Sequence, residues 1–223
     1  MNEPTEDVSR RRFLAITGGL AAAVSVGLSA PRAASAAPPT DLPANPLNNP
    51  PARPDALATY PVEGSNASVT LLSGPSAVVL LHVARRFHYE VATLGAKDIT
   101  GYAELPAGTP FAADHRSGTA FSVLPTRYPA GATGGLFPHE LAVVRDILAE
   151  CEGVVRWGGD FRKIPKEGHF RIDVKPVDPT LARVADKIRG WVDGPGRGAP
   201  ADPFAPGRRQ AAERLAQRQI ATG

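Results

Sequence analysis

Two short stretches lie close together in the sequence: Trp157-Gly158-Gly159-Asp160-Phe161 and His169-Phe170-Arg171-Ile172-Asp173. The second begins eight residues after Phe161. The first stretch predicts a tight turn, because adjacent glycines allow backbone conformations that other residues avoid. The second alternates polar and apolar residues, as a half-buried strand does. Two further runs, 118–124 and 154–157, have the same β-rich character. We expect these runs to form one small antiparallel sheet.

Three helices are expected beside this sheet. Residues 73–95 begin with a serine that can cap a helix, carry apolar residues at helical spacing and end in glycine. Residues 138–153 and 179–192 each begin with a proline at the first helical position and repeat apolar residues in the same way. The predicted fold class is therefore α+β, a small antiparallel sheet with flanking helices in a single domain.

A second segment carries residues suited to chemistry: His115-Arg116-Ser117-Gly118-Thr119-Ala120-Phe121-Ser122. His115 stands just before an expected strand, and His169 opens another strand of the same sheet. Two histidines from neighbouring strands are part of the ligand set that zinc uses in proteins. Taken alone, the pair is compatible with ordinary packing as well as with a metal site.

The N-terminus predicts export. Ser9-Arg10-Arg11-Arg12-Phe13-Leu14 places consecutive arginines before an apolar run over 13–30, and Ala34-Ser35-Ala36 offers a small-x-small cleavage site. We expect a twin-arginine signal peptide and a mature protein that starts at Ala37. An uncleaved N-terminal anchor is the alternative, and either outcome gives an extracytoplasmic location, secreted or at the cell wall.

Changes in composition along the chain, above all its Pro- and Gly-rich stretches, predict four parts. Residues 1–36 are the signal peptide, and residues 37–60 are a proline-rich linker. Residues 61–192 are the α+β domain including its C-terminal helix. Residues 193–223 are a Gly/Pro-rich linker and a short basic helix that we expect to be flexible.

Composition limits the partners. Removal of the signal leaves 187 residues with 21 basic and 19 acidic side chains, which favours neither nucleic acid nor a strong attraction to membrane surfaces. The single cysteine, Cys151, cannot form an intramolecular disulfide. We expect a monomer without a transmembrane span in its mature form.

The two motifs together resemble the D-alanyl-D-alanine carboxypeptidase and L-alanyl-D-glutamate endopeptidase family of zinc peptidases. Family members read Ser-x-His-x-x-Gly-x-Ala-x-Asp, then Trp-Gly-Gly-Asp with an aromatic residue, then an acid three residues before His-Phe. Residues 113–122 and 157–170 align with these patterns without gaps inside either motif. The resemblance implies a small α+β fold, zinc held by His115 and His169, and peptidoglycan stem peptides as substrates.

The chain departs from the family in three places. Many relatives have an arginine after Gly-Tyr that grips a substrate carboxylate, and Gly101-Tyr102-Ala103-Glu104-Leu105 has none. Ser122 stands where the family has a ligand aspartate, and Lys166 stands where it has the catalytic acid. A neutral hydroxyl is a poor zinc ligand, and a protonated lysine is neither a ligand nor a base. Glu167 is the candidate substitute base, because Gly168 gives its loop freedom, and Asp114 is a second neighbouring carboxylate that could reach the metal.

The resemblance also makes Trp157 and Arg86 the predicted substrate-binding residues. Core packing is the alternative for Trp157, and an i,i+4 ion pair with Glu90 is the alternative for Arg86. Two functions follow. The first is an exported zinc-metallopeptidase-like protein with an impaired site; the second is a non-catalytic descendant that binds cell-wall peptides or a partner protein.

Overall fold

The computed structural model describes residues 50–106, 108–192 and 202–222. The expected signal peptide, residues 37–49 of the expected linker, and residues 193–201 lie outside the described residues. Among the helices that are described, none combines the length and apolar character needed to cross a membrane.

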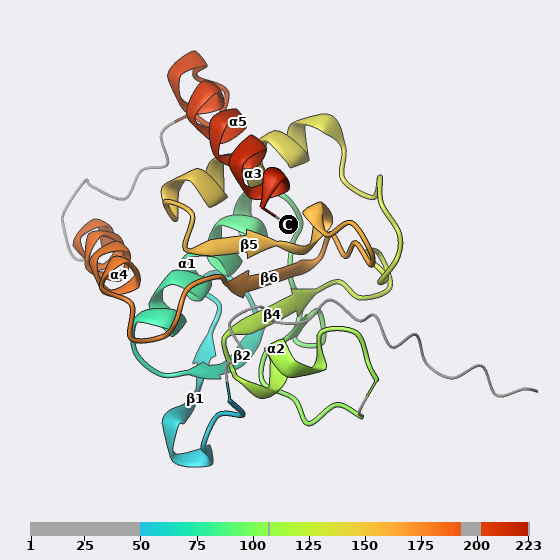
Figure 1. Ribbon diagram of the computed structural model, residues 1–223, viewed down its shortest axis with the longest axis vertical. Helices are drawn as coiled ribbons and strands as arrows, with labels where there is room; N and C mark the ends of the chain where they lie inside the picture. The colour runs from blue at the N-terminus through green and yellow to red at the C-terminus, as the bar shows by residue number, and fades with distance from the viewer. Residues whose placement is uncertain (1–49, 107, 193–201, 223) are drawn as a thin grey trace, which may run out of the picture. The chain divides into compact units, whose positions relative to one another are not determined.

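A four-stranded antiparallel sheet forms the centre of the domain, in the order β3 (Ile99–Thr100), β4 (Ala120–Val123), β6 (His169–Ile172) and β5 (Val155–Trp157). Figure 1 shows β4, β6 and β5 side by side. The expected small sheet is confirmed, and so is the α+β class. All four residues of β6 are buried, so both faces of this strand are covered.

The two faces of β6 have different chemistry because side chains alternate along a strand. Phe170 stacks on Phe121 of β4 at 5.3 Å between ring centroids and meets Phe87 edge-on at 5.9 Å. His169 and Arg171 occupy the alternate positions. One face therefore belongs to the apolar core and the other to a polar cluster.

A second, two-stranded sheet pairs β1 (Leu57–Pro61) with β2 (Ser68–Leu72), after a 3-10 turn η1 (Pro54–Ala56). The predicted boundary at residue 60 is wrong, because residues 57–60 belong to β1 rather than to a linker. The pairing register joins Leu57 to Leu72 across the hairpin. The prolines that precede the strand hid this short β run in the sequence.

The expected helices are present as α1 (Pro75–Glu90), α3 (Pro138–Glu150) and α4 (Pro179–Val192), each with proline at its start. α1 packs on β6 and α3 packs on β5, while α4 lies against α1. Helix α1 ends before Val91 instead of continuing to Gly95. The backbone N–H of Leu94 donates to Nδ1 of His88 at 2.9 Å, which holds the chain after the helix in a turn.

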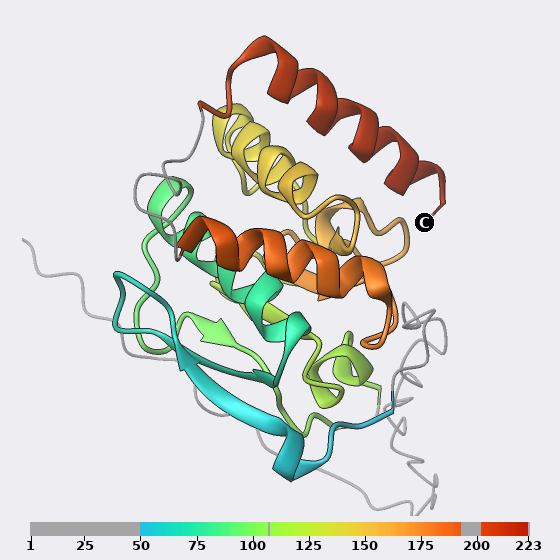
Figure 2. The same cartoon turned by 90° about the vertical axis from the view of Figure 1, so that its left-hand side faces the viewer.

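The C-terminal segment corrects our expectation of a flexible tail. Residues 206–221 form α5, a helix of 16 residues that lies along α3, as Figure 2 shows. Arg208 pairs with Asp146 at 2.6 Å, and the Gln219 side chain donates to a backbone carbonyl of β5 at 2.8 Å. This helix docks through buried Ala212 and Leu215 as well as through these polar contacts, which an apolar pattern in the sequence does not reveal.

A buried charge cluster joins α1 to α3. The Arg86 guanidinium, 5% exposed, donates to Glu90 at 2.5 Å, to Asp146 at 2.8 Å and to Glu150 at 2.9 Å. The carboxylates of this network raise the pKa of Arg86 despite its burial. The hydrogen bond with His82, the charge of Arg86 and a hydrogen bond from Arg208 lower the pKa of Glu150 to about 2 despite its burial. Because these groups are out of water, each depends on its partners.

We predict that Arg86→Met lowers the free energy of unfolding by about 3 to 5 kcal/mol, because buried carboxylates lose a partner. Urea unfolding of the mature chain measures this change. Arg85→Met is the matched control: Arg85 pairs at 3.2 Å with Glu63, whose side chain is 66% exposed, and its loss should cost less than about 1 kcal/mol. Equal losses in the two variants would contradict the role given to the cluster.

Candidate functional site

Strand pairing brings the two motifs together. The register of β4 and β6 sets Ser122 directly opposite His169, so their side chains lie on the same face of the sheet. His115 comes from α2 (Ala112–Arg116), a short helix that leads through Gly118 into β4. Gly118 has φ 65°, and a Cβ there would lie 2.9 Å from the backbone nitrogen of Leu72, so this close approach requires glycine.

Both histidines point one ring nitrogen at the Ser122 hydroxyl. Nε2 of His115 lies 3.0 Å from Ser122 Oγ, and Nδ1 of His169 lies 3.1 Å from the same oxygen. All three side chains are buried. The predicted ligands His115 and His169 are therefore brought to one point, and the residue at that point is Ser122.

The other ring nitrogen of each histidine is anchored. Nδ1 of His115 donates to the carbonyl oxygen of Gly101 at 2.6 Å, and Nε2 of His169 lies 3.1 Å from Oδ2 of Asp114. A carbonyl or carboxylate in this position fixes the ring orientation and is the arrangement that metal-binding histidines use. Asp114 thus accepts a hydrogen bond from the ring nitrogen of His169 that points away from Ser122.

Lys166 reaches the same hydroxyl. Its Nζ donates to Ser122 Oγ at 3.0 Å. Nδ1 of His115 donates to Gly101 and Nε2 of His169 donates to Asp114, so both rings present an acceptor nitrogen to Ser122, whose one hydroxyl hydrogen can serve only one of them. The oxygen of Ser122 in turn accepts from Lys166.

Aromatic rings cover the histidine cluster. Phe111 stacks on His169 with 4.4 Å between ring centroids, and Phe161 stacks on Phe111 at 5.7 Å. Phe111 holds φ 65°, the left-handed region that a bulky residue rarely adopts. Sequence reasoning missed Phe111, since it lies outside both motifs and only its backbone conformation marks it as special.

Glu167, the predicted substitute base, faces a different segment. Its carboxylate accepts hydrogen bonds from the backbone N–H groups of Gly134 at 2.9 Å and Gly135 at 2.7 Å. The side chain is buried, so these two bonds satisfy a charge that lacks full hydration. To act on a substrate, Glu167 would have to leave both amides.

Trp157 and Arg86, the predicted substrate-binding residues, are engaged within the fold. The Trp157 indole donates to the backbone carbonyl of Glu167 at 2.6 Å, and the Arg145 guanidinium lies 4.8 Å from the indole ring centroid. Trp157 is 3% exposed. Arg86 belongs to the buried charge cluster between α1 and α3. Both sets of contacts match the structural alternatives, and a substrate role stays a prediction.

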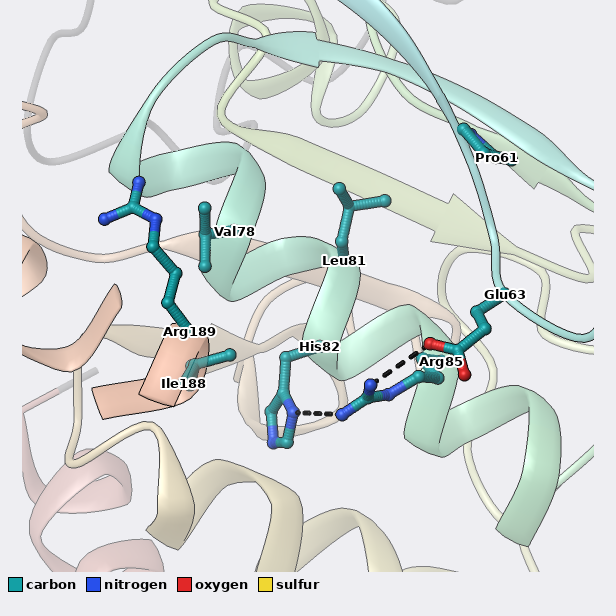
Figure 3. A pocket seen from close by; sticks show the side chains of 8 residues that line it. All are labelled: Pro61, Glu63, Val78, Leu81, His82, Arg85, Ile188 and Arg189. Atoms are coloured by element: carbon teal, nitrogen blue, oxygen red, sulfur yellow. Dashed lines mark hydrogen bonds and ion pairs between the residues drawn. The ribbon is translucent and has the colours of Figure 1, made fainter. Parts of the chain in front are cut away.

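A cavity of about 280 Å³ lies elsewhere, over α1 and α4 beside the β1–β2 hairpin (Figure 3). Val78, Leu81 and Ile188 line its apolar part. Its charged residues are already paired: Arg85 with Glu63 at 3.2 Å, and Arg189 with Asp186 at 2.6 Å. The cavity is lined by neither His115 nor His169, so it is separate from the site that the motifs predict.

No protein-family model, no curated protein and no solved structure matches this chain. What this chain does is therefore inferred from the two motifs and from the contacts among their side chains. Those contacts join His115, Ser122, Lys166 and His169.

The donor set does not fit zinc in its usual form. Within the described ranges, no group of three or more His, Cys, Asp or Glu side chains is placed to hold a metal ion. Two imidazole nitrogens converge, but the third position has a neutral hydroxyl, and an ammonium lies 3.0 Å from that oxygen. Zinc sites in proteins use three or four nitrogen, sulfur or carboxylate ligands, and a neighbouring cation opposes binding of a second one.

Burial, chiefly, lowers the pKa of His115 from 6.5 to about 4, with a further contribution from neighbouring His169. A histidine with a lowered folded-state pKa binds fewer protons in the folded protein than in the unfolded chain. Its contribution to stability is therefore lost as the pH falls from 6.5 towards about 4.

We predict that the free energy of unfolding of the wild-type chain falls as the pH is lowered over this range. His115→Asn should make this loss smaller, by about 3 kcal/mol or less. Thermal unfolding at a series of pH values measures the effect. His139→Asn, at an exposed position, is the control and should leave the pH dependence unchanged. A slope that His115→Asn does not alter would contradict the neutral, buried state given to His115.

Proposed function

We propose that this chain is an exported, non-hydrolytic relative of the D-alanyl-D-alanine carboxypeptidase and L-alanyl-D-glutamate endopeptidase family, and that it binds peptidoglycan stem peptides. The observation that carries this proposal is the 3.0 Å hydrogen bond from Lys166 to Ser122. At the two positions where the family has carboxylates, this chain has an ammonium and a hydroxyl that bond to each other.

This exchange removes the two charges on which zinc hydrolysis depends. An anionic ligand offsets the charge of the metal, and a carboxylate near the metal-bound water accepts its proton. Ser122 supplies no negative charge, and a protonated Lys166 accepts no proton. The remaining parts are those of a retained scaffold: two anchored histidines and the 3-10 turn η2 (Gly158–Asp160).

A zinc peptidase with Glu167 as its base is the second candidate. The anchored ring nitrogens of His115 and His169 favour it, because both rings are already oriented as metal ligands are. It requires Glu167 to break its bonds to Gly134 and Gly135, and it requires Lys166 to move away from Ser122. These two rearrangements place it second.

We predict that the mature chain from Ala37, purified without chelators, contains less than about 0.1 zinc per chain, and that Ser122→Asp with Lys166→Asp raises this to about one. The double change replaces the hydroxyl and the ammonium with two carboxylates. Metal content is measured by mass spectrometry, and His169→Ala in the same background is the control that should abolish the gain. One zinc per wild-type chain, lost in His169→Ala, would overturn the non-hydrolytic proposal in favour of the peptidase.

Binding to the wall is tested separately. The mature chain should sediment with purified peptidoglycan sacculi and should release no stem-peptide amino acids from them. Bovine serum albumin in the same assay is the control for trapping. Failure to sediment would reject peptidoglycan as the ligand and leave a partner protein as the remaining alternative.

A further inference from the structure

The ammonium of Lys166 has an unusual lack of acidic partners. Its Nζ donates to Ser122 Oγ at 3.0 Å and lies 5.5 Å from the ring centroid of Phe111. In the part of the chain that the structure describes, Lys166 takes part in no ion pair with a carboxylate. Two of its three N–H donors have no hydrogen-bond partner among the described residues.

Burial makes an ammonium without an acidic partner costly in free energy. Lys166 is only partly exposed, and burial alone lowers the pKa of its side chain. A partly desolvated ammonium gains most from an anion that both cancels its charge and accepts its hydrogen bonds. None of the described residues places such an anion beside it.

The neighbouring carboxylates are engaged elsewhere. Oδ2 of Asp114 faces His169 at 3.1 Å and Arg171 at 3.5 Å. The carboxylate of Glu167 is held by two backbone amides of the 134–135 segment. The site around Ser122 therefore contains a cation without a matching negative charge.

The aromatic side chains beside Lys166 add an apolar contact. Phe111 and Phe161 stack on each other, and Arg171 lies 4.7 Å from the ring centroid of Phe161. Cations over aromatic faces keep their charge while one side is shielded from water. Because Phe111 is itself buried, these rings shield one side of the ammonium, and the exposed side of Lys166 suits a small ligand with one carboxylate.

We propose that Lys166 forms a carboxylate-binding site, in which its Nζ, held in place by Ser122, pairs with the carboxylate of a small ligand. The identification of that carboxylate with the C-terminus of a stem peptide rests on the proposed function; the carboxylate specificity itself does not. The site would bind and orient a carboxylate-bearing ligand without reacting with it.

The test compares two probes of nearly equal shape on the ¹⁵N-labelled mature chain: N-acetylglycine, which carries a carboxylate, and N-acetylglycinamide, its neutral analogue. N-acetylglycine should shift the backbone amide resonances of Ser122 and His169 in a saturable way, with at least roughly tenfold tighter binding than the amide. Lys166→Met should weaken N-acetylglycine binding by roughly tenfold or more. Lys175→Met, at an exposed position, is the control and should leave it unchanged.

Equal affinity of the wild-type chain for both probes, or no detectable binding of either, would overturn the proposal without the need for any variant. Unchanged N-acetylglycine binding by a folded Lys166→Met chain would overturn it as well. Binding of N-acetylglycine through Lys166 by a chain that does not sediment with sacculi would support the carboxylate site and reject peptidoglycan as its natural source. The two proposals can therefore fail independently.

Discussion

The antiparallel pairing of β4 with β6 is the constraint on which the site depends. It sets Ser122 opposite His169 and, through Gly118, places α2 so that His115 meets the same hydroxyl. A shift of one residue in this register would turn Ser122 to the opposite face, into the phenylalanine core. The packing of Phe121 on Phe170 therefore fixes the polar cluster as well as the core.

Charge compensation is organised in opposite ways in two places. Between α1 and α3, Arg86 is surrounded by carboxylates, and Arg208 from α5 joins the same network. Around Ser122, Lys166 has a hydroxyl and an aromatic ring but no acid from the described part of the chain. The first arrangement is a closed network that holds helices together, while the second leaves a cation ready for an external partner.

The two histidine rings are oriented as in a metal site, but Ser122, the residue between them, does not suit a metal. Gly101 and Asp114 hold the rings as in a metal site, whereas Ser122 and Lys166 remove the negative charge that a metal requires. A fold can keep such positioning contacts after the charges change, because the anchors are themselves buried hydrogen bonds whose loss would be costly. This physical separation is why we place binding ahead of hydrolysis.

The sequence predicted the α+β class, the three helices α1, α3 and α4 and the small sheet, because their apolar periods and turn residues are local signals. It also predicted that His115 and His169 would lie together, from two spaced motifs. It missed β1, where prolines interrupt the signal, and the docking of α5, where Arg208 and Gln219 form polar contacts with residues far away in the chain.

By itself, then, the sequence determined which residue types stand at the motif positions, including Ser122 and Lys166. Only the tertiary structure decided that these two bond to each other, that Asp114 supports His169, and that Glu167 holds the 134–135 backbone. The physical reason is that side-chain direction at a loop and partner choice in a buried cluster depend on contacts between distant segments. Periodicity and spacing along one chain do not contain those contacts.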